Sequence, residues 1–187
     1  MADKPKIMGF EWIQFDLPPM EDMGTDYNGF NLVYEKGSNF PRQGSVLRMF
    51  TSIGVTGEIA SGAGLVAQSR YRNYLLGKNP LERERIYQDL KRALRQQARM
   101  GMAQIDILLW DFAGKYYNAP VFELLGGHIK PLPCYASTTH GDHNGGLDSP
   151  QAYADFAERC LDLGYPAFKI HGWGDSQTEL EIANIHE

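Results

Sequence analysis

The sequence of 187 residues has few cysteines, no long hydrophobic segment and no cluster of basic residues. Two cysteines do not make a disulfide framework, and so few thiols are typical of a reducing compartment. No apolar stretch reaches the roughly 18 residues that a transmembrane helix needs. The formal net charge is −5, so a nucleic-acid partner is not expected. Because the polar start Met1–Lys6 is not followed by a leader-like stretch, we expect a soluble cytoplasmic protein without a membrane partner.

What is present is an ordinary globular composition, and the first third of it predicts β-structure. Ile7–Leu17 is rich in apolar and aromatic residues, and we expect its strand to end at Pro18-Pro19. Ser45–Thr56 contains two short apolar runs around Gly54, which is typical of a hairpin. Pro18–Gly44, between these segments, predicts a long connection that is either disordered or a functional loop or lid.

The middle of the chain predicts helices. Leu65–Leu76 is followed by Gly77, a plausible C-cap. Asn79-Pro80 predicts the start of a charged helix that runs to about Gln97. Ala98–Tyr117 is apolar on nearly all its helical faces, so we expect this helix to be buried between other elements.

Two carboxylates, Asp106 and Asp111, lie within this apolar helix. A buried carboxylate without a partner is unfavourable. We therefore expect both to bond to neighbouring backbone or to an arginine, in a structural role.

The last third predicts one βαβ unit. Gly126-Gly127 indicates a domain boundary, and Leu132–Ser137 predicts a short strand after it. Ser149-Pro150 predicts the start of a helix that ends at Leu163, and Pro166–His171 predicts a second strand. Strand, helix and strand at this spacing indicate parallel pairing and a right-handed crossover.

Two segments carry a family resemblance. Met102–Lys115 (MAQIDILLWDFAGK) and Pro120–Gly127 (PVFELLGG) resemble the signature of the mandelate racemase/muconate lactonising enzyme family of the enolase superfamily. The segments Tyr135–Ser137 and Ala167–His171 resemble the first two strands of that family's barrel. The resemblance covers essentially the whole chain. It implies an α+β capping domain, with a three-stranded antiparallel sheet and a helix bundle, over residues 1–127. Residues 128–187 are then the truncated start of a TIM-type (β/α) barrel.

The same resemblance implies a chemistry. Enzymes of this family remove the proton α to a substrate carboxylate and stabilise the enediolate on Mg²⁺, as racemases, acid-sugar dehydratases or cycloisomerases. The partner expected is therefore a small carboxylate or sugar acid, and the full-length protein is expected to be a homo-oligomer. The family's Mg²⁺ ligands lie on later barrel strands, beyond residue 187. We expect no metal ligand within this chain and no activity from this fragment alone.

Lys169 and His171 are the candidate catalytic residues. Alternation along a strand puts both on one face, opposite Phe168 and Ile170, and a barrel would turn that face inward near its C-terminal mouth. The pair resembles the family's Lys-x-Lys, with His171 in place of the second lysine. A neutral imidazole can accept a proton at pH 7, so we expect His171 to be a general base or a substrate contact. The alternative is a hydrogen-bonded barrel residue.

Loop residues complete the predicted site. His140 follows the first barrel strand and is expected to contact substrate, whereas its spacing from His143 is only a weak zinc signal. Trp173 either lines the pocket or packs. Tyr27 lies in the long first connection, which with Ser61–Gly64 resembles the two cap loops that close over the family's site.

A non-catalytic reading stays open, in which the chain is a cap-like binding or assembly module or an inactive fragment. The following ~150 residues of a barrel would discriminate between the two, because three acidic residues at successive strand ends support the enzyme.

Overall fold

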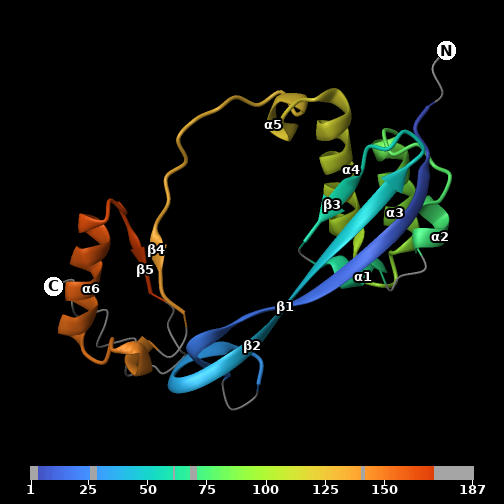
Figure 1. Cartoon of the computed structure of the whole chain (residues 1–187). Coiled ribbons are helices and arrows are strands. Elements are labelled where there is room, and N and C mark those ends of the chain that lie inside the picture. The colour runs from blue at the N-terminus through green and yellow to red at the C-terminus, as the bar shows by residue number, and fades with distance from the viewer. Residues whose placement is uncertain (1–3, 26–28, 61, 68–70, 140–141, 171–187) are drawn as a thin grey trace. The chain divides into compact units, whose positions relative to one another are not determined.

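The computed structural model describes residues 4–25, 29–60, 62–67, 71–139 and 142–170 (Figure 1). The chain forms two compact units. The first unit comprises residues 1–16 and 43–129, and the second comprises residues 17–42 and 130–187. Among the described helices, none has the length and apolar character needed to cross a membrane.

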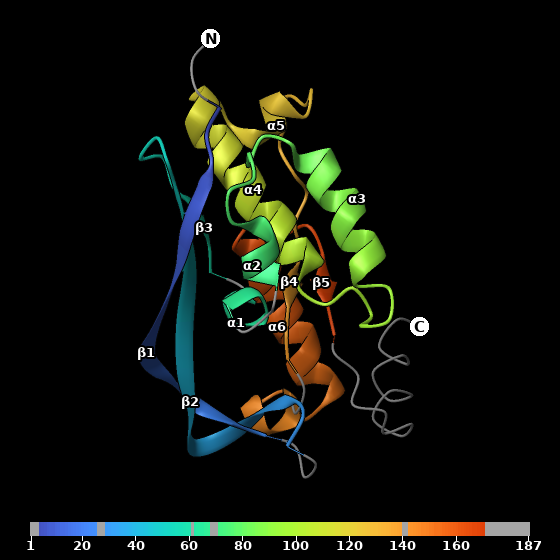
Figure 2. The same ribbon diagram turned by 90° about the vertical axis from the view of Figure 1, so that its right-hand side faces the viewer.

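In the first unit, helices cover one side of a three-stranded antiparallel sheet (Figure 2). The strands are ordered β1 (Ile7–Thr25), β2 (Leu32–Thr51) and β3 (Gly57–Ile59), and Leu47 of β2 pairs with Ile59 of β3. The helices are α1 (Ala63–Ala67), α2 (Tyr71–Leu75), α3 (Arg83–Ala93), α4 (Met102–Tyr117) and α5 (Val121–Leu124). The sheet and helices together are the architecture expected of the capping domain.

The core of this unit lies between the sheet and α4. Leu47 and Met49 alternate inward from β2 and are fully buried together with Leu108 and Phe112 of α4. Gly57 brings β3 close to α4, because a Cβ built on it would lie 2.5 Å from the carbonyl oxygen of Leu108. A glycine at this position is therefore a requirement of the helix–strand contact.

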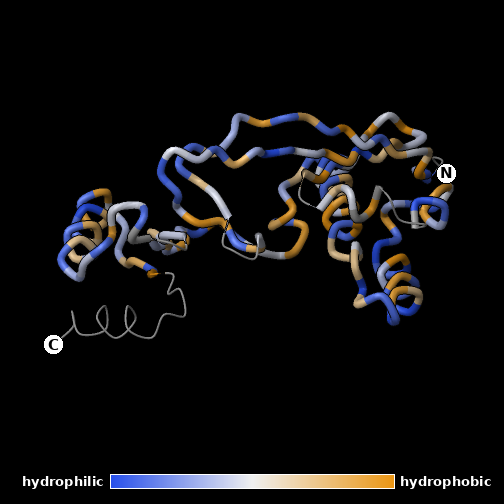
Figure 3. Tube along the Cα trace, turned by 90° about the horizontal axis from the view of Figure 1, so that it is seen from below, coloured by the Kyte–Doolittle hydropathy of each residue, from blue (hydrophilic) through white to orange (hydrophobic). Residues whose placement is uncertain are grey.

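β1 and β2 form a long hairpin that corrects two predictions. Pro18-Pro19 does not end β1, and Pro18–Gly44 is not an irregular loop. β3 pairs only near the base of β2, so the rest of the hairpin is a two-stranded ribbon with free edges, where proline is tolerated. Figure 3 shows orange and blue residues mixed along these strands, without the continuous apolar run of a buried strand.

The helices of the first unit differ from the predictions at their boundaries. The predicted helix Leu65–Leu76 is described as α1 and α2, on either side of residues 68–70, which lie outside the described residues. α3 begins at Arg83 rather than at Pro80, because the Asn79 side chain accepts the Leu81 N–H at 3.0 Å and closes a turn first.

α4 is buried between other elements as predicted on one side, but not around its whole circumference. Leu108 and Phe112 are completely buried, but Ile107 is 53% exposed and Tyr117 is 56% exposed. Within this unit, α4 contacts β3, α1, α3 and α5, and these elements leave Ile107 exposed. The first unit therefore leaves part of the apolar surface of α4 exposed.

The second unit contains the predicted βαβ arrangement. β4 (Ala136–Ser137) and β5 (Phe168–Lys169) are parallel, with α6 (Pro150–Asp162) between them in sequence and the 3₁₀ helix η1 (Asp142–Gly145) after β4. The Ser149 side chain caps α6 by accepting the Ala152 N–H at 3.2 Å. The parallel pairing is confirmed, but both strands are shorter than predicted, and Leu132 lies outside β4 with 74% of its surface exposed.

Candidate active site

The carboxyl ends of β4 and β5 position the one predicted catalytic residue that the structure describes. Phe168 faces α6, because its ring packs against Phe156 with centroids 5.5 Å apart. Lys169 is the next residue along β5, so it lies on the opposite face, beside its register partner Ser137. The Thr138 N–H donates to the Lys169 carbonyl at 3.3 Å and extends the pairing beyond β4. The strand thus presents an ammonium group on the face that α6 does not cover.

A cavity of about 540 Å³ lies in the same unit as this strand pair. It is lined by residues from the far half of the hairpin and by the turn at the end of η1, namely Glu21, Asp22, Tyr34, Lys36, Asn144, Gly145 and Gly146. We call it the hairpin cavity. The Tyr34 ring holds its two sides together, because a Cβ built on Gly145 would lie only 3.0 Å from ring atoms of Tyr34. A larger residue at position 145 would require the Tyr34 ring to move by a few tenths of an ångström.

Three of the seven described residues that line the hairpin cavity are charged. Asp22 has a left-handed backbone, and its Oδ1 accepts the Gly37 N–H from the neighbouring strand at 2.8 Å. Glu21 and Lys36 are exposed and form no ion pair within the part of the chain that the structure describes. The Glu21 carboxylate and the Lys36 ammonium group can therefore bind a solute in the cavity. The Asp22 carboxylate lies beside them and also holds the two strands of the hairpin together.

The structure does not describe the other predicted site residues. His171, His140, Trp173 and Tyr27 all lie outside the described residues. Among the described residues, no group of three or more His, Cys, Asp or Glu side chains comes together that could hold a metal ion. These residues therefore do not form a site that fits Mg²⁺.

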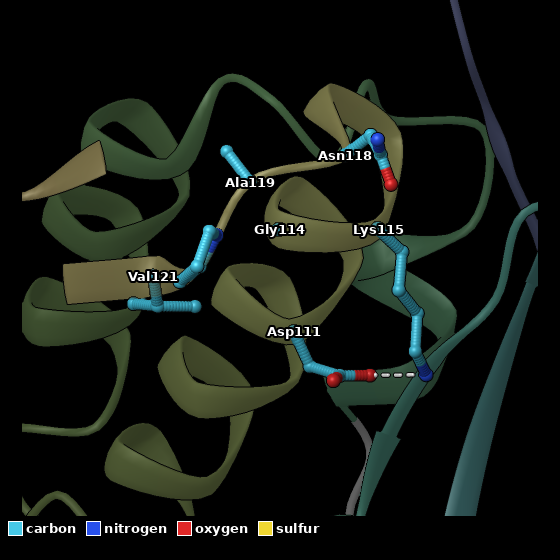
Figure 4. Close-up of a pocket in the computed structure, with 7 residues that line it drawn as sticks. Asp111, Gly114, Lys115, Asn118, Ala119 and Val121 are labelled. Carbon is cyan, nitrogen blue, oxygen red and sulfur yellow. Dashed lines mark hydrogen bonds and ion pairs between the residues drawn. The ribbon is translucent and has the colours of Figure 1, made fainter. Parts of the chain in front are cut away.

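A second group of charges joins the sheet to α4. Asp111 accepts the Glu58 N–H at 2.7 Å. It also accepts the Lys115 ammonium at 2.7 Å, the interaction drawn in Figure 4. Glu58 in turn binds Lys115 at 3.1 Å and Arg48 at 2.6 Å, and Arg48 reaches Glu11 at 3.5 Å. We call these five residues the cap ion network. The predicted structural role of Asp111 is confirmed, with a backbone N–H as one partner and a lysine, which was not predicted, as the other.

The cap ion network shifts the ionisation of its members. The hydrogen bond from Arg48, with that from Lys115, lowers the pKa of Glu58. Burial alone would lower the pKa of Lys115, but hydrogen bonds to Asp111 and Glu58 outweigh it and raise the pKa. Both groups therefore stay charged over a wider pH range than when free.

Asp106 has a different environment, between α3 and α4. The Arg83 guanidinium lies over the Trp110 ring, 3.1 Å from its centroid, and lines a second cavity with Asp106. Partial burial raises the pKa of Asp106, and the charge of Arg83 opposes that rise. The arginine expected near this carboxylate is thus present as an electrostatic neighbour.

Sequence reasoning did not find the residues of the hairpin cavity. Tyr34 and Lys36 are two positions apart on β2, the spacing that puts side chains on one face of a strand. This spacing places Tyr34 and Lys36 together only if residues 32–51 are known to form a strand.

Comparison with known proteins shows the family. The model for "Mandelate racemase / muconate lactonizing enzyme, N-terminal domain" matches residues 45–126. A D-xylonate dehydratase of Haloferax volcanii is 30% identical over 151 residues, which are 75% of this chain and 36% of that enzyme. A D-galactarolactone cycloisomerase of Agrobacterium fabrum is 35% identical over 124 residues, 63% of this chain and 32% of that enzyme. The chain thus spans about a third of the length of these relatives.

Solved structures give the same fold. The crystal structure of a D-glucarate dehydratase from Agrobacterium tumefaciens, complexed with magnesium, superimposes with a TM-score of 0.74 at 24% identity. The match covers 97% of this chain and 50% of that one. Residues 45–126 are the N-terminal domain of the mandelate racemase/muconate lactonizing enzyme family, and the fold of the chain is that of solved members of the enolase superfamily.

Proposed function

We propose that this chain is the N-terminal part of a Mg²⁺-dependent enolase-superfamily enzyme that removes the proton α to the carboxylate of a sugar acid. The reaction is dehydration or racemisation. The observation that carries the proposal is the position of Lys169, at the carboxyl end of a parallel strand and on the face away from α6. In a (β/α) barrel that face turns inward and that end holds the active site. Relatives named as a D-xylonate dehydratase and a D-gluconate dehydratase support a sugar acid as the substrate class.

Each site residue has a proposed role. Lys169 binds the substrate carboxylate or supports the base, and its ammonium group stabilises negative charge as the α-proton leaves. His171 is the general base or a substrate contact, since a neutral imidazole can take up that proton at pH 7. His140, Trp173 and Tyr27 contact the substrate from the surrounding loops.

The metal is supplied from elsewhere in this proposal. We place its ligands on barrel strands three, four and five, because the family resemblance puts them there. The D-glucarate dehydratase structure contains magnesium, which supports a requirement for this ion in our proposal. It does not support any particular position of the ion in this chain. The chain by itself is then inactive.

The proposed organisation follows from these roles. Residues 1–127 form the capping domain, and residues 128–187 begin the barrel. We propose a soluble, cytoplasmic homo-oligomer whose partner is a small carboxylate, without a nucleic-acid or membrane partner.

A screen of the full-length polypeptide with Mg²⁺ tests this function. Sugar acids and α-hydroxy acids are incubated in D₂O, and both deuterium uptake at the α-carbon and loss of water are followed. The proposal expects one or both for at least one acid. A full-length protein that exchanges and dehydrates none of them, and that lacks three acidic residues at successive strand ends, supports the non-catalytic module instead.

A further inference from the structure

The cavity that Asp106 and Arg83 share lies between α3 and α4, which pack side by side in the first unit (Figure 2). It has a volume of about 340 Å³ and is lined by Arg83, Glu84, Tyr87, Asp106 and Trp110. We call it the α3–α4 cavity. All five lining residues belong to the first unit, so the cavity is defined by that unit alone.

Two opposite charges line this cavity without a bond to each other. The side chains of Asp106 and Arg83 are both half-buried, yet neither makes a hydrogen bond or an ion pair with another described residue. Burial raises the pKa of Asp106 and lowers the pKa of Arg83, as expected when a charge loses water and gains too little in return. Glu84, the third charged residue of the lining, already accepts the Gln88 amide at 2.7 Å.

The Arg83 guanidinium is oriented by the Trp110 ring. Its central carbon lies over that ring, 3.1 Å from the centroid. Stacking of this kind leaves the N–H groups at the edge of the guanidinium able to donate two parallel hydrogen bonds, the geometry that a carboxylate accepts. Arg83 is therefore suited to a carboxylate, whereas Asp106 in the same cavity is suited to an ammonium group.

Apolar groups adjoin the two charges. The rings of Tyr87 and Trp110 form part of the lining, and a closed gap between the same helices shares Arg83, Tyr87 and Asp106 with the cavity. The other residues around this gap are apolar, namely Ile86, Leu90, Met102, Ile105 and Leu109. The site therefore combines a group for an anion, a group for a cation and an apolar surface.

We propose that the α3–α4 cavity binds a free α-amino acid with an apolar side chain. Arg83 binds the carboxylate of the ligand, Asp106 binds its ammonium group, and its side chain lies against Tyr87. An α-amino acid carries both charges on one carbon, so it can bridge two protein groups that do not bond to each other. The volume of about 340 Å³ is in the range of small-molecule sites. This binding is independent of the proposed reaction, because it involves neither Lys169 nor Mg²⁺.

Three ligands with the same branched chain test the need for both charges. L-Leucine carries the carboxylate and the ammonium group, 4-methylpentanoate lacks the ammonium group, and isopentylamine lacks the carboxylate. Their binding to the full-length polypeptide is measured by isothermal titration calorimetry, with the ligand-induced rise in Tm as a second readout. We expect L-leucine to bind and each analogue to bind roughly tenfold more weakly, because each analogue leaves one half-buried charge without a partner.

Two substitutions locate the binding. Asp106→Asn removes a charge and Arg83→Lys removes the paired N–H groups, so each should raise the Kd of L-leucine roughly tenfold. Asp106→Asn should not weaken the binding of 4-methylpentanoate, because that ligand has no ammonium group. Glu158→Gln, which also replaces a carboxylate by an amide but on an exposed residue of α6 outside the lining, is the control and should leave the Kd unchanged. The Tm of each variant without ligand shows that it is folded.

Several results would overturn this inference. L-Leucine that produces neither heat nor a Tm shift at about 10 mM does so, because no useful affinity then remains. Isopentylamine or 4-methylpentanoate that binds as tightly as L-leucine would indicate a site for one charge only. Unchanged binding of L-leucine to both variants would place the amino acid elsewhere on the protein. If a variant does not fold, the ranking of the three ligands on the wild type decides. The proposed function is tested separately, by turnover.

Discussion

Replacing Gly57 with alanine should strongly destabilise the first unit. The added Cβ would lie 2.5 Å from the Leu108 carbonyl oxygen, 3.1 Å from the Phe112 Cβ and 3.2 Å from a methyl carbon of Met49. The first of these is backbone in the middle of α4, so it cannot move aside as a flexible side chain can. Overpacking a core costs about 1–3 kcal/mol, and we expect the upper part of that range.

The assay is thermal and urea unfolding of the chain. A loss of about 2–3 kcal/mol lowers the Tm of a chain of this size by about 5–10 °C. Gly9→Ala is the matched control, because no heavy atom lies within 4 Å of its built Cβ and its backbone is not left-handed. That variant should be neutral or stabilised by up to about 1 kcal/mol. A Gly57→Ala protein within about 0.5 kcal/mol of the wild type would refute the close approach of β3 to α4.

Three further substitutions test other contacts. Glu58→Gln should lower the Tm at pH 7, and the difference should shrink as the pH falls below 4.5, the ordinary glutamate pKa, because the Arg48 hydrogen bond lowers the Glu58 pKa and its contribution to stability is lost only as that carboxylate takes up a proton in the folded protein. Melting curves at several pH values check this, and a constant difference would contradict it. Ser149→Ala should cost about 0.5–2 kcal/mol in urea unfolding, whereas an aspartate there should retain the cap of α6. Tyr74→Phe should cost about 1 kcal/mol of stability by removing the hydrogen bond to Asp89. Burial raises the pKa of Tyr74 to about 12, so an ultraviolet pH titration of the variant should lose the phenol that ionises at that pH.

Local signals in the sequence predicted the βαβ unit well. Ser149-Pro150 and the glycine at 164 bound α6 as expected, because capping chemistry depends on only a few neighbouring residues. The family signature in α4 also predicted the capping domain.

The hairpin could not be predicted in the same way. Pro18-Pro19 is a strong local stop signal, and β1 passes it because the ribbon has free edges, a property of the pairing rather than of the residues themselves. The hairpin cavity was missed for the same reason, since its two sides are more than a hundred residues apart in the sequence. The exposure of Ile107 likewise depends on which elements pack around α4.

The most direct test of the central claim is α-proton exchange by the full-length enzyme and its Lys169→Ala variant. Wild-type protein is incubated in D₂O with Mg²⁺ and the sugar acid that it turns over, and deuterium at the α-carbon is followed by NMR. Glu158→Gln serves as the control for a surface charge change. We predict exchange in the wild type and the control, and a loss of at least a hundredfold, about 3 kcal/mol, in Lys169→Ala. Unchanged exchange in Lys169→Ala would contradict the assignment of this strand end to the active site.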